Sequence, residues 1–374
     1  MARRKGKSGR RIKDWHSRYR GGDDVGDVTP RGKQMSRRAV KLREERFAAP
    51  AGEPLDGYPG AEGMVVGLFR GGAAVRVHDR TLLCGIAKTF RAPEGSSPLA
   101  VGDGVKVALT RPEHADGETA ADKDRADGMI LSRRPRASAL SRPVPWSAKR
   151  RDEYQGDVPE RVIAANMEVL LIVASARQPR TPRTLVDRFL IIAERGELTP
   201  VLVVNKIDLA EPDEEIVGDC GDLGVEAFAV SASTGKGLPA LAGALRDKRS
   251  VLAGASGVGK TTLINALVPG ADGATGAVRA KDERGRHTTS GAAVYDLPGS
   301  GMLVDTPGIR ELGVTLDATE LPWYFPEFET HARQCRFNNC THTHEPDCAV
   351  QRAVEAGEIP MRRYESYLRI FDSL

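Results

Sequence analysis

The sequence predicts three folded domains in series: a small closed β-barrel, an α/β domain with a parallel sheet, and a small, mostly α-helical domain that binds a metal ion. Five short apolar runs, separated by turns rich in glycine and proline, lie between residues 60 and 141, as in a small barrel. Apolar strands then alternate with amphipathic helical stretches, such as 183–195 and 238–246, up to about residue 311, as in a parallel sheet covered by helices. Three of the five cysteines crowd into residues 335–348.

The composition excludes several classes of protein. With 374 residues, 40% of them hydrophobic and 28% charged, the chain has material for two or three domains. Its longest apolar run, near residues 169–176, is far shorter than the ~18–20 residues that cross a bilayer. No apolar stretch follows the basic N-terminus, as it would in a secretory signal. We therefore expect a cytoplasmic protein without a membrane partner.

Residues 1–58 form a basic arm. The first fifty residues hold sixteen Lys and Arg against six Asp and Glu, a balance of +10, whereas the rest of the chain carries −6. The arm has little periodicity, so we expect it to be disordered when free. Such an arm favours a polyanionic partner such as nucleic acid, because phosphate contacts release counterions. The alternative is a solvated tail without a partner.

Residues 59–142 are assigned to the barrel. The strand-like runs are MVVGLF (64–69), AAVRVH (73–78), TLLCGIA (81–87), GVKVAL (104–109) and GMILS (128–132). Five short strands favour an oligonucleotide-binding fold (OB-fold), with an SH3-like barrel as the alternative. A linker at 143–158 follows, and the α/β domain is assigned to 159–314.

The α/β domain contains a phosphate loop. Residues 254–261 (GASGVGKT) fit the pattern G-x-x-x-x-G-K-[ST] between a strand and a helix. In such a loop the backbone N–H groups turn toward the phosphates, the lysine neutralises the β- and γ-phosphates, and the next hydroxyl binds Mg²⁺. The expected nucleotide-binding residues are Gly254, Ala255, Ser256, Gly257, Val258, Gly259, Lys260, Thr261 and Thr262, with Thr261 also a magnesium ligand.

Two segments upstream of this loop predict a guanine base. Asn205, Lys206 and Asp208 follow an apolar strand, where open α/β sheets place their ligands. The Asp208 carboxylate can accept from N1–H and the exocyclic amine of guanine, donors that adenine does not present there. Asn205 is expected to brace the nucleotide loops and Lys206 to lie over the base. The backbone N–H groups expected to reach guanine O6 follow the next strand, in Ser231, Ala232 and Ser233.

Two further segments follow the phosphate loop. The sequence DTPG (305–308) ends a strand, so Asp305 is expected to hold Mg²⁺ through water and the Gly308 N–H to sense the γ-phosphate. Before it, the polar, glycine-rich residues 270–291 are expected to form a switch that phosphate and metal order. One of two switch threonines, Thr288 or Thr289, is expected to complete the magnesium shell.

The order of these segments predicts a circular permutation. The base-recognition segments precede the phosphate loop, the switch and DTPG, whereas in ordinary GTPases the phosphate loop comes first. A sheet with adjacent termini can be cut and rejoined without changing its contacts. The sequence therefore predicts a circularly permuted P-loop GTPase domain. A P-loop ATPase or small-molecule kinase is the alternative, and base preference separates the two.

The C-terminal domain, 315–374, contains the pattern C-x4-C-x-H-x5-C. Four N and S ligands within fourteen residues suit a closed, structural Zn²⁺ site, and so short a domain needs the metal to fold. The cysteines are Cys335, Cys340 and Cys348, and His342 supplies the imidazole, with His331 and His344 as competitors. A disulfide would need an oxidising compartment and would leave one of these cysteines unpaired.

Together these segments resemble the bacterial family of ribosome small-subunit-dependent GTPase A proteins, also called YjeQ. The resemblance covers roughly residues 60–370 and rests on NKID, SGVGKTTLIN, GRHTT, DTPGIRE and CRFNNCTHTHEPDCAV. It implies an OB-fold barrel, a permuted GTPase domain and a zinc domain whose imidazole ligand matches His342. It also implies binding to the small ribosomal subunit and its 16S rRNA late in maturation, with GTP hydrolysed there to GDP and phosphate. We expect a monomer.

The catalytic group is the least specific part of this interpretation. Ile309 follows DTPG, where many GTPases place a glutamine that orients water. The family shares this replacement, and its switch histidine is matched here by His287, which the resemblance implies as the catalytic residue. We expect slow intrinsic turnover that the subunit stimulates. The alternatives are a spectator histidine and a nucleotide-regulated RNA-binding module that barely hydrolyses GTP.

Overall fold

The computed structural model describes residues 60–90, 98–109, 126–143, 160–268, 270, 292–306 and 316–374. The predicted arm (1–58), nearly all of the linker (143–158) and most of the switch lie outside these residues, as do His287, Thr288, Thr289 and Gly308. The described residues fall into two compact units, 60–306 and 316–374. Within this part of the chain, no helix is both long enough and apolar enough to pass through a bilayer.

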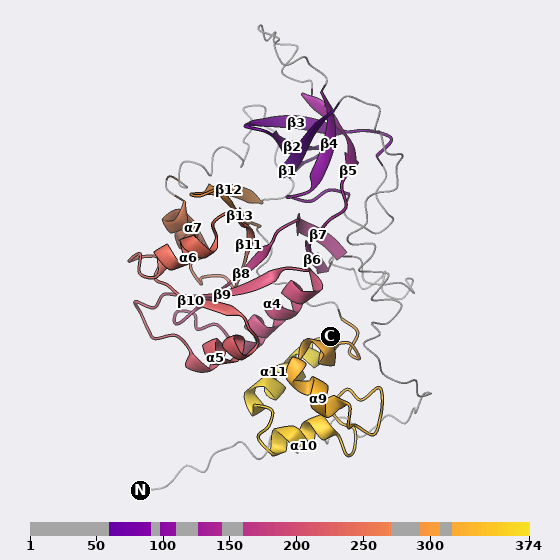
Figure 1. The fold of residues 1–374 in the computed structure, drawn as a ribbon, viewed down its shortest axis with the longest axis vertical. Helices are drawn as coiled ribbons and strands as arrows, with labels where there is room; N and C mark the ends of the chain where they lie inside the picture. The colour runs from indigo at the N-terminus through magenta and orange to yellow at the C-terminus, as the bar shows by residue number, and fades with distance from the viewer. Residues whose placement is uncertain are drawn as a thin grey trace. The chain divides into compact units, whose positions relative to one another are not determined.

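The first five strands form a closed barrel (Figure 1). They are β1 (Ala61–Phe69), β2 (Gly72–Val77), β3 (Arg80–Ile86), β4 (Gly104–Leu109) and β5 (Gly128–Arg133). The barrel closes because β1 pairs with both β2 and β4, while β3 pairs in parallel with β5. Apolar side chains such as Val65, Val75 and Ile130 fill its interior. This strand order is that of an OB-fold, so the predicted barrel is confirmed and the SH3-like alternative is not supported.

A buried ion pair joins the start of β4 to the segment after β5. The Asp103 carboxylate accepts from Arg136 Nε at 2.7 Å and Nη2 at 2.8 Å, and also from the Ala100 N–H at 2.7 Å. Arg133 Nη1 lies 3.8 Å from the same carboxylate, and burial lowers the pKa of Arg133 to about 10 although Asp103 opposes that shift. Because all three charged side chains are buried, the carboxylate is the group that makes their burial tolerable.

The α/β domain is built on a six-stranded sheet with the order β10-β9-β8-β11-β13-β12. Its strands are β8 (Val169–Ser175), β9 (Thr199–Asn205), β10 (Glu226–Ala229), β11 (Arg249–Ala253), β12 (Ala293–Leu297) and β13 (Gly301–Asp305). All are parallel except β12, which pairs antiparallel with β13. The strand before the phosphate loop, β11, lies in the middle of the sheet although the base-recognition strands precede it in the chain. The predicted permuted α/β domain is thus confirmed.

Helices cover both faces of this sheet. They are α4 (Arg183–Arg195), α5 (Glu214–Asp222), α6 (Leu238–Ala244) and α7 (Lys260–Leu267). Alternate residues of β8 point to opposite faces, so Leu170 and Ile172 pack with α4 and α5, whereas Leu171 and Val173 pack with α6 and α7. The predicted helix at 183–195 has the bounds of α4, which begins after Pro182 and ends before Gly196.

The barrel packs against one face of the sheet at β12 and β13. Val66 and Ala74 of the barrel belong to the same buried core as Val294 and Val304 of the β12–β13 hairpin. Beside this contact, β6 (Ala139–Pro143) and β7 (Glu160–Ala165) form a two-stranded sheet of their own. Asn166 fastens the junction, because its Nδ2 donates to the Gly102 carbonyl at 2.9 Å and its Oδ1 accepts from the Ala137 N–H at 2.9 Å.

The C-terminal unit consists of short helices. They are η3 (Leu321–Tyr324), η4 (Pro326–Phe328), α9 (Glu329–Ala332), α10 (Ala349–Glu355) and α11 (Met361–Phe371). Tyr364, Tyr367 and Leu368 are buried on one face of α11, as the spacing of its apolar residues predicts. The Tyr367 ring packs against Phe325 and Phe328, with ring centroids 5.1 and 5.0 Å away. The predicted small, mostly helical domain is confirmed.

Candidate nucleotide site and metal centre

Four parallel strands bring the predicted nucleotide residues to one edge of the sheet. β9 ends at Asn205, β11 ends directly before the phosphate loop, β13 ends at Asp305, and β10 ends two residues before Ser231. Because the carboxyl ends of parallel strands lie at the same edge, segments that are far apart in the chain become neighbours there. This is where open α/β sheets bind their ligands.

The phosphate loop requires its glycines. Gly254 and Gly259 have φ values of +152° and +95°, a region that favours glycine. A Cβ at Gly254 would lie 2.4 Å from the Val173 carbonyl oxygen, and one at Gly259 would lie 2.4 Å from Asn205 Nδ2. The Lys260 ammonium donates to the carbonyls of the first two loop residues at 2.7 and 2.6 Å, so it lies inside the curve of the loop, where a phosphate chain needs positive charge.

Asn205 joins the phosphate loop to the base-recognition loop. Its buried side chain donates from Nδ2 to the Val258 carbonyl at 3.0 Å and accepts at Oδ1 from the Ala232 N–H at 3.0 Å. One amide thereby fixes the distance between two loops whose sequences lie on either side of β11. These contacts place Asn205 between the two segments that it is predicted to brace.

Asp208 and Ser231 form the centre of the predicted base site. The Ser231 hydroxyl donates to Asp208 Oδ1 at 2.6 Å, and its oxygen lies 3.0 Å from Ser233 Oγ and accepts from the Thr234 N–H at 3.2 Å. The hydrogen bond from Ser231 is the main reason that the pKa of Asp208 falls below its usual value. Asp208 is therefore held as an ionised acceptor, the state that two guanine donors require.

Some backbone N–H groups of residues 231–233 already donate hydrogen bonds within the protein. Ser231 N–H donates to the Lys236 carbonyl at 2.9 Å, and the Ala232 N–H donates to Asn205. Of the three N–H groups predicted to reach guanine O6, two thus have partners within the protein. The sequence assigned Ser231 a backbone role, whereas the structure shows that its side chain also contacts Asp208.

The candidate magnesium ligands lie on neighbouring elements. Asp305 ends β13, which pairs with β11, and Thr261 is the second residue of α7 and is exposed. The neighbouring Thr262 is exposed as well. Hydroxyl and carboxylate oxygens are the ligands that Mg²⁺ prefers, so the donors present fit the ion. The other candidates, Thr288 and Thr289, lie outside the described residues, as do His287 and Gly308.

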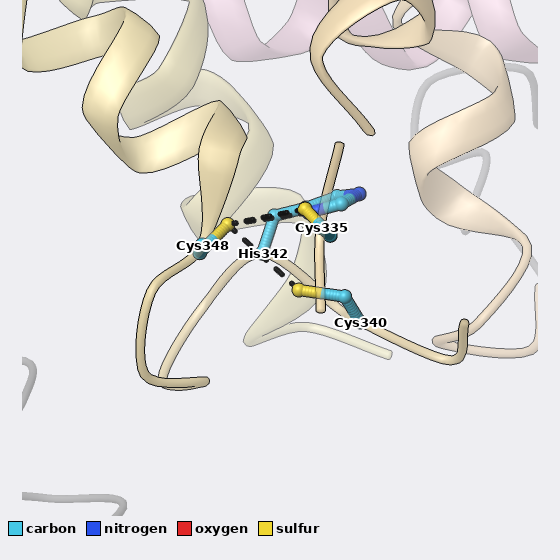
Figure 2. Close-up of side chains that lie close together, drawn as sticks. All are labelled: Cys335, Cys340, His342 and Cys348. Carbon is cyan, nitrogen blue, oxygen red and sulfur yellow. Dashed lines mark hydrogen bonds between the residues drawn. The ribbon is translucent and has the colours of Figure 1, made fainter. Parts of the chain in front are cut away.

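The cysteines and histidine predicted to bind zinc converge on one point in the C-terminal unit (Figure 2). The one potential ligand atom of each residue lies within 4.8 Å of the others. Cys335 Sγ lies 3.9 Å and Cys340 Sγ lies 3.8 Å from Cys348 Sγ. His342 Nδ1 lies 3.6 Å from Cys335 Sγ and 3.4 Å from Cys348 Sγ.

These distances fit a tetrahedral zinc site. With Zn–S bonds of ~2.3 Å and a Zn–N bond of ~2.0–2.1 Å, tetrahedral angles put two sulfurs ~3.8 Å apart and a sulfur and a nitrogen ~3.6 Å apart. The four separations given above lie within about 0.2 Å of these values, and the sulfur–sulfur distances are far from the ~2.05 Å of a disulfide. None of the five cysteines forms a disulfide, and Cys84 and Cys220 are buried elsewhere.

The competing histidines do not join this cluster. His331 Nδ1 lies 3.7 Å from Glu358, and the exposed His344 contacts Thr343 Oγ1 through Nδ1 at 2.9 Å. Within the cluster, the hydrogen bond from Cys340 lowers the pKa of Cys348 well below its ordinary value. Deprotonation of Cys348 is thereby favoured, and the thiolate is the form that binds metal.

A carboxylate that the sequence analysis did not single out braces the metal-binding loop. Glu345 accepts from the Thr341 N–H at 2.6 Å and its hydroxyl at 2.7 Å, and from the N–H groups of Thr343 and His344 at 3.2 and 3.3 Å. Partial burial raises its pKa, but hydrogen bonds, those from Thr341 foremost, together with the nearby His344 outweigh that effect, and the net pKa is lowered. In the sequence, this role of Glu345 was indicated only by its position between the predicted ligands His342 and Cys348.

The chain is similar to known proteins over most of its length. A family model described as "RsgA GTPase" matches residues 134–315. A protein of Gemmatimonas aurantiaca named "Small ribosomal subunit biogenesis GTPase RsgA" is 41% identical over 283 residues, which cover 75% of this chain and 86% of that protein. The crystal structure of YjeQ from Thermotoga maritima is similar with a TM-score of 0.59 and 29% identity, covering 84% of this chain and 98% of that one.

A second solved structure carries the same topology. It is described as "YloQ, a circularly permuted GTPase", and it is similar with a TM-score of 0.57 and 25% identity, covering 85% of this chain and 96% of that one. The permuted order of strands in the present sheet is the order expected from that description.

Proposed function

The chain belongs to the RsgA family of GTPases, and we propose that it hydrolyses GTP to GDP and phosphate while bound to the small ribosomal subunit late in that subunit's maturation. The observation that carries the proposal is the Asn205 brace, because it joins a phosphate-binding loop to a loop with a guanine-type carboxylate. The relative of Gemmatimonas aurantiaca is named for the biogenesis of that subunit.

We propose that the guanine base is recognised by Asp208, with the Lys206 stem over its ring and an N–H group of the 231–233 segment near O6. An adenine base would leave the ionised Asp208 without its two donors, which disfavours ATP. The triphosphate is proposed to lie along 254–262, with the Lys260 ammonium on the β- and γ-phosphates. Gly308 is proposed to contact the γ-phosphate.

Hydrolysis needs charge neutralisation and an oriented water. Mg²⁺, when bound, neutralises charge on the β- and γ-phosphates, and its proposed ligands are Thr261, Asp305 and one of Thr288 and Thr289. His287 is proposed to position the water. Since Ile309 cannot orient water, we propose that intrinsic turnover is slow and that the ribosomal subunit raises it.

The C-terminal unit is proposed to hold one structural Zn²⁺ through Cys335, Cys340, His342 and Cys348. The ion, when bound, supplies no open coordination position and therefore cross-links the loop. Support comes from the match between the ligand separations and tetrahedral geometry. We further propose that the barrel, this unit and the basic arm (1–58) contact 16S rRNA, and that the protein is a cytoplasmic monomer.

The proposed GTPase activity is tested by measuring steady-state GTP hydrolysis with and without purified small ribosomal subunits. The measurement is made at several fixed salt concentrations, because phosphate contacts weaken as salt rises. We expect stimulation by the subunit that declines with salt. An unchanged rate at every subunit concentration would favour the nucleotide-regulated RNA-binding module instead.

The base site has its own test. Asp208→Asn exchanges a hydrogen-bond acceptor for a donor, so it should weaken the binding of GDP. It should strengthen the binding of xanthosine diphosphate, because xanthine carries a 2-oxo group in place of the guanine amine. ADP should compete with neither nucleotide. Competition by ADP in the wild-type protein would indicate an ATPase or kinase.

A further inference from the structure

The loop that follows β8, residues 176–180, lies at the nucleotide edge although no nucleotide motif includes it. β8 pairs with β9 on one side and with β11 on the other. Those two strands lead to the base-recognition loop and the phosphate loop. The chain therefore leaves β8 between the two halves of the proposed site.

Two buried side chains close this loop. The Ser175 N–H donates to Thr181 Oγ1 at 2.8 Å, and the Thr181 N–H donates to the Ser175 carbonyl at 3.2 Å. The Ser175 hydroxyl in turn donates to the Arg177 carbonyl at 2.7 Å. Ser175 is 3% exposed and Thr181 is 5% exposed, so these hydrogen bonds are shielded from water and fix the shape of the loop.

The closed loop contacts both halves of the proposed site. The Lys206 ammonium donates to the Gln178 carbonyl and to the Gly257 carbonyl, the latter at 2.6 Å. A Cβ placed on Gly257 would lie 3.3 Å from Pro179 Cδ, so the loop also lies directly against the phosphate loop. Lys206 thus spans from the base-recognition strand to two other segments.

We propose that residues 176–180 form a third wall of the guanine-nucleotide site, and that Ser175 and Thr181 are positioning residues that hold this wall against Lys206. The inference rests on the proposed function and adds to it the element that controls how long the nucleotide stays bound. A lysine side chain is flexible and loses much rotamer freedom when it is ordered. Two fixed carbonyl acceptors order it before the base arrives, so less binding free energy is lost on association.

The test uses a pair of threonines. Thr181→Val keeps the shape of the side chain but removes the acceptor for the buried Ser175 N–H. We expect dissociation of a fluorescent GDP analogue to become roughly tenfold faster, since an unpaired buried amide costs about as much free energy as a tenfold change represents. Thr181→Ser restores the hydroxyl and should return the rate to within about twofold of wild type.

Thr184→Val is the matched control. Thr184 Oγ1 is buried and has no hydrogen-bond partner among the described residues, so its removal leaves none of their groups unpaired and should leave GDP dissociation unchanged. If Thr181→Val does not fold, Ser175→Ala removes the hydrogen bond to Arg177 and should accelerate dissociation in the same direction, with a smaller change. Equal rates for wild type and a folded Thr181→Val or Ser175→Ala protein overturn the proposal.

A double-mutant cycle shows whether the wall acts through Lys206. In a Lys206→Met background, Thr181→Val should accelerate dissociation by less than about twofold, because the contact that it perturbs is already gone. A full tenfold effect in that background contradicts the proposed route. Wild-type protein that binds no guanine nucleotide refutes the proposed function itself, which separates the two failures.

Discussion

Replacing Asn205 by alanine removes the brace between the two nucleotide loops. The change deletes two hydrogen bonds of 3.0 Å and leaves the buried Val258 carbonyl without that donor. Losing the bond from the Ala232 N–H costs about 1 kcal/mol net, and leaving the buried Val258 carbonyl unpaired costs about 1–3 kcal/mol. We therefore expect Asn205→Ala to lose roughly 2–4 kcal/mol in total, shared between folding and the arrangement of the loops.

The share that falls on the loops appears in nucleotide affinity. If about half of the loss opposes binding, GDP affinity falls by roughly 5- to 30-fold, since 1.4 kcal/mol is a factor of ten. Titration calorimetry with GDP measures this share, and urea denaturation of the protein without nucleotide measures the rest.

Asn166 offers a matched control because its side chain makes the same kind of bridge at the barrel junction, with two hydrogen bonds of 2.9 Å. Its φ is +55°, so alanine also adds backbone strain there. Asn166→Ala should lower stability by a similar amount and leave GDP affinity within about twofold. The reasoning is refuted if Asn205→Ala loses stability while its GDP affinity equals that of wild type.

Three further results are expected. A zinc chelator should extract one Zn²⁺ per chain and abolish the near-ultraviolet circular dichroism of the packed tyrosines in the C-terminal unit. The reason is that the metal supplies much of the folding free energy of this unit. An unchanged spectrum after extraction would show that the unit folds without the metal. Glu345 has a lowered pKa in the folded state, so it stabilises the protein above its ordinary pKa of 4.5, and that stability disappears as the pH falls through the lower folded value. Glu345→Gln should therefore be less stable at neutral pH by about 1–3 kcal/mol. The difference from wild type in urea denaturation should shrink as the pH falls below 4.5 and vanish below the lowered folded pKa. Asp103→Asn removes the charge that compensates Arg136 and should cost about 3–5 kcal/mol in urea denaturation, whereas Arg76→Ala, which breaks a partly exposed ion pair with Asp296, should cost less than about 1 kcal/mol.

Local patterns predicted the local elements well. The helix at 183–195 has the predicted bounds because Pro182 and Gly196 flank an apolar periodicity, and each of the five barrel strands contains most of its predicted run. The phosphate loop and the metal cluster are equally predictable, since their chemistry depends on residues that are close together in the chain.

Contacts between distant residues escaped the sequence analysis. Nothing in the pattern around Asp103 indicates Arg136 as its partner, because charge pairing across a barrel leaves no periodic signal. The wall at 176–180 has no nucleotide motif, and its contact with Lys206 depends on the order of strands in the sheet. The two-stranded β6–β7 sheet escaped for the same reason, since its strands flank the predicted linker.

The barrel's place on the sheet bears on how this protein can be divided. A fragment that starts after the linker lacks the barrel, so the apolar side chains of Val294 and Val304 would be exposed to water. An exposed apolar patch of this kind promotes self-association. The barrel therefore forms an outer layer of the catalytic domain. We expect that deleting it would yield an aggregation-prone fragment rather than a minimal enzyme.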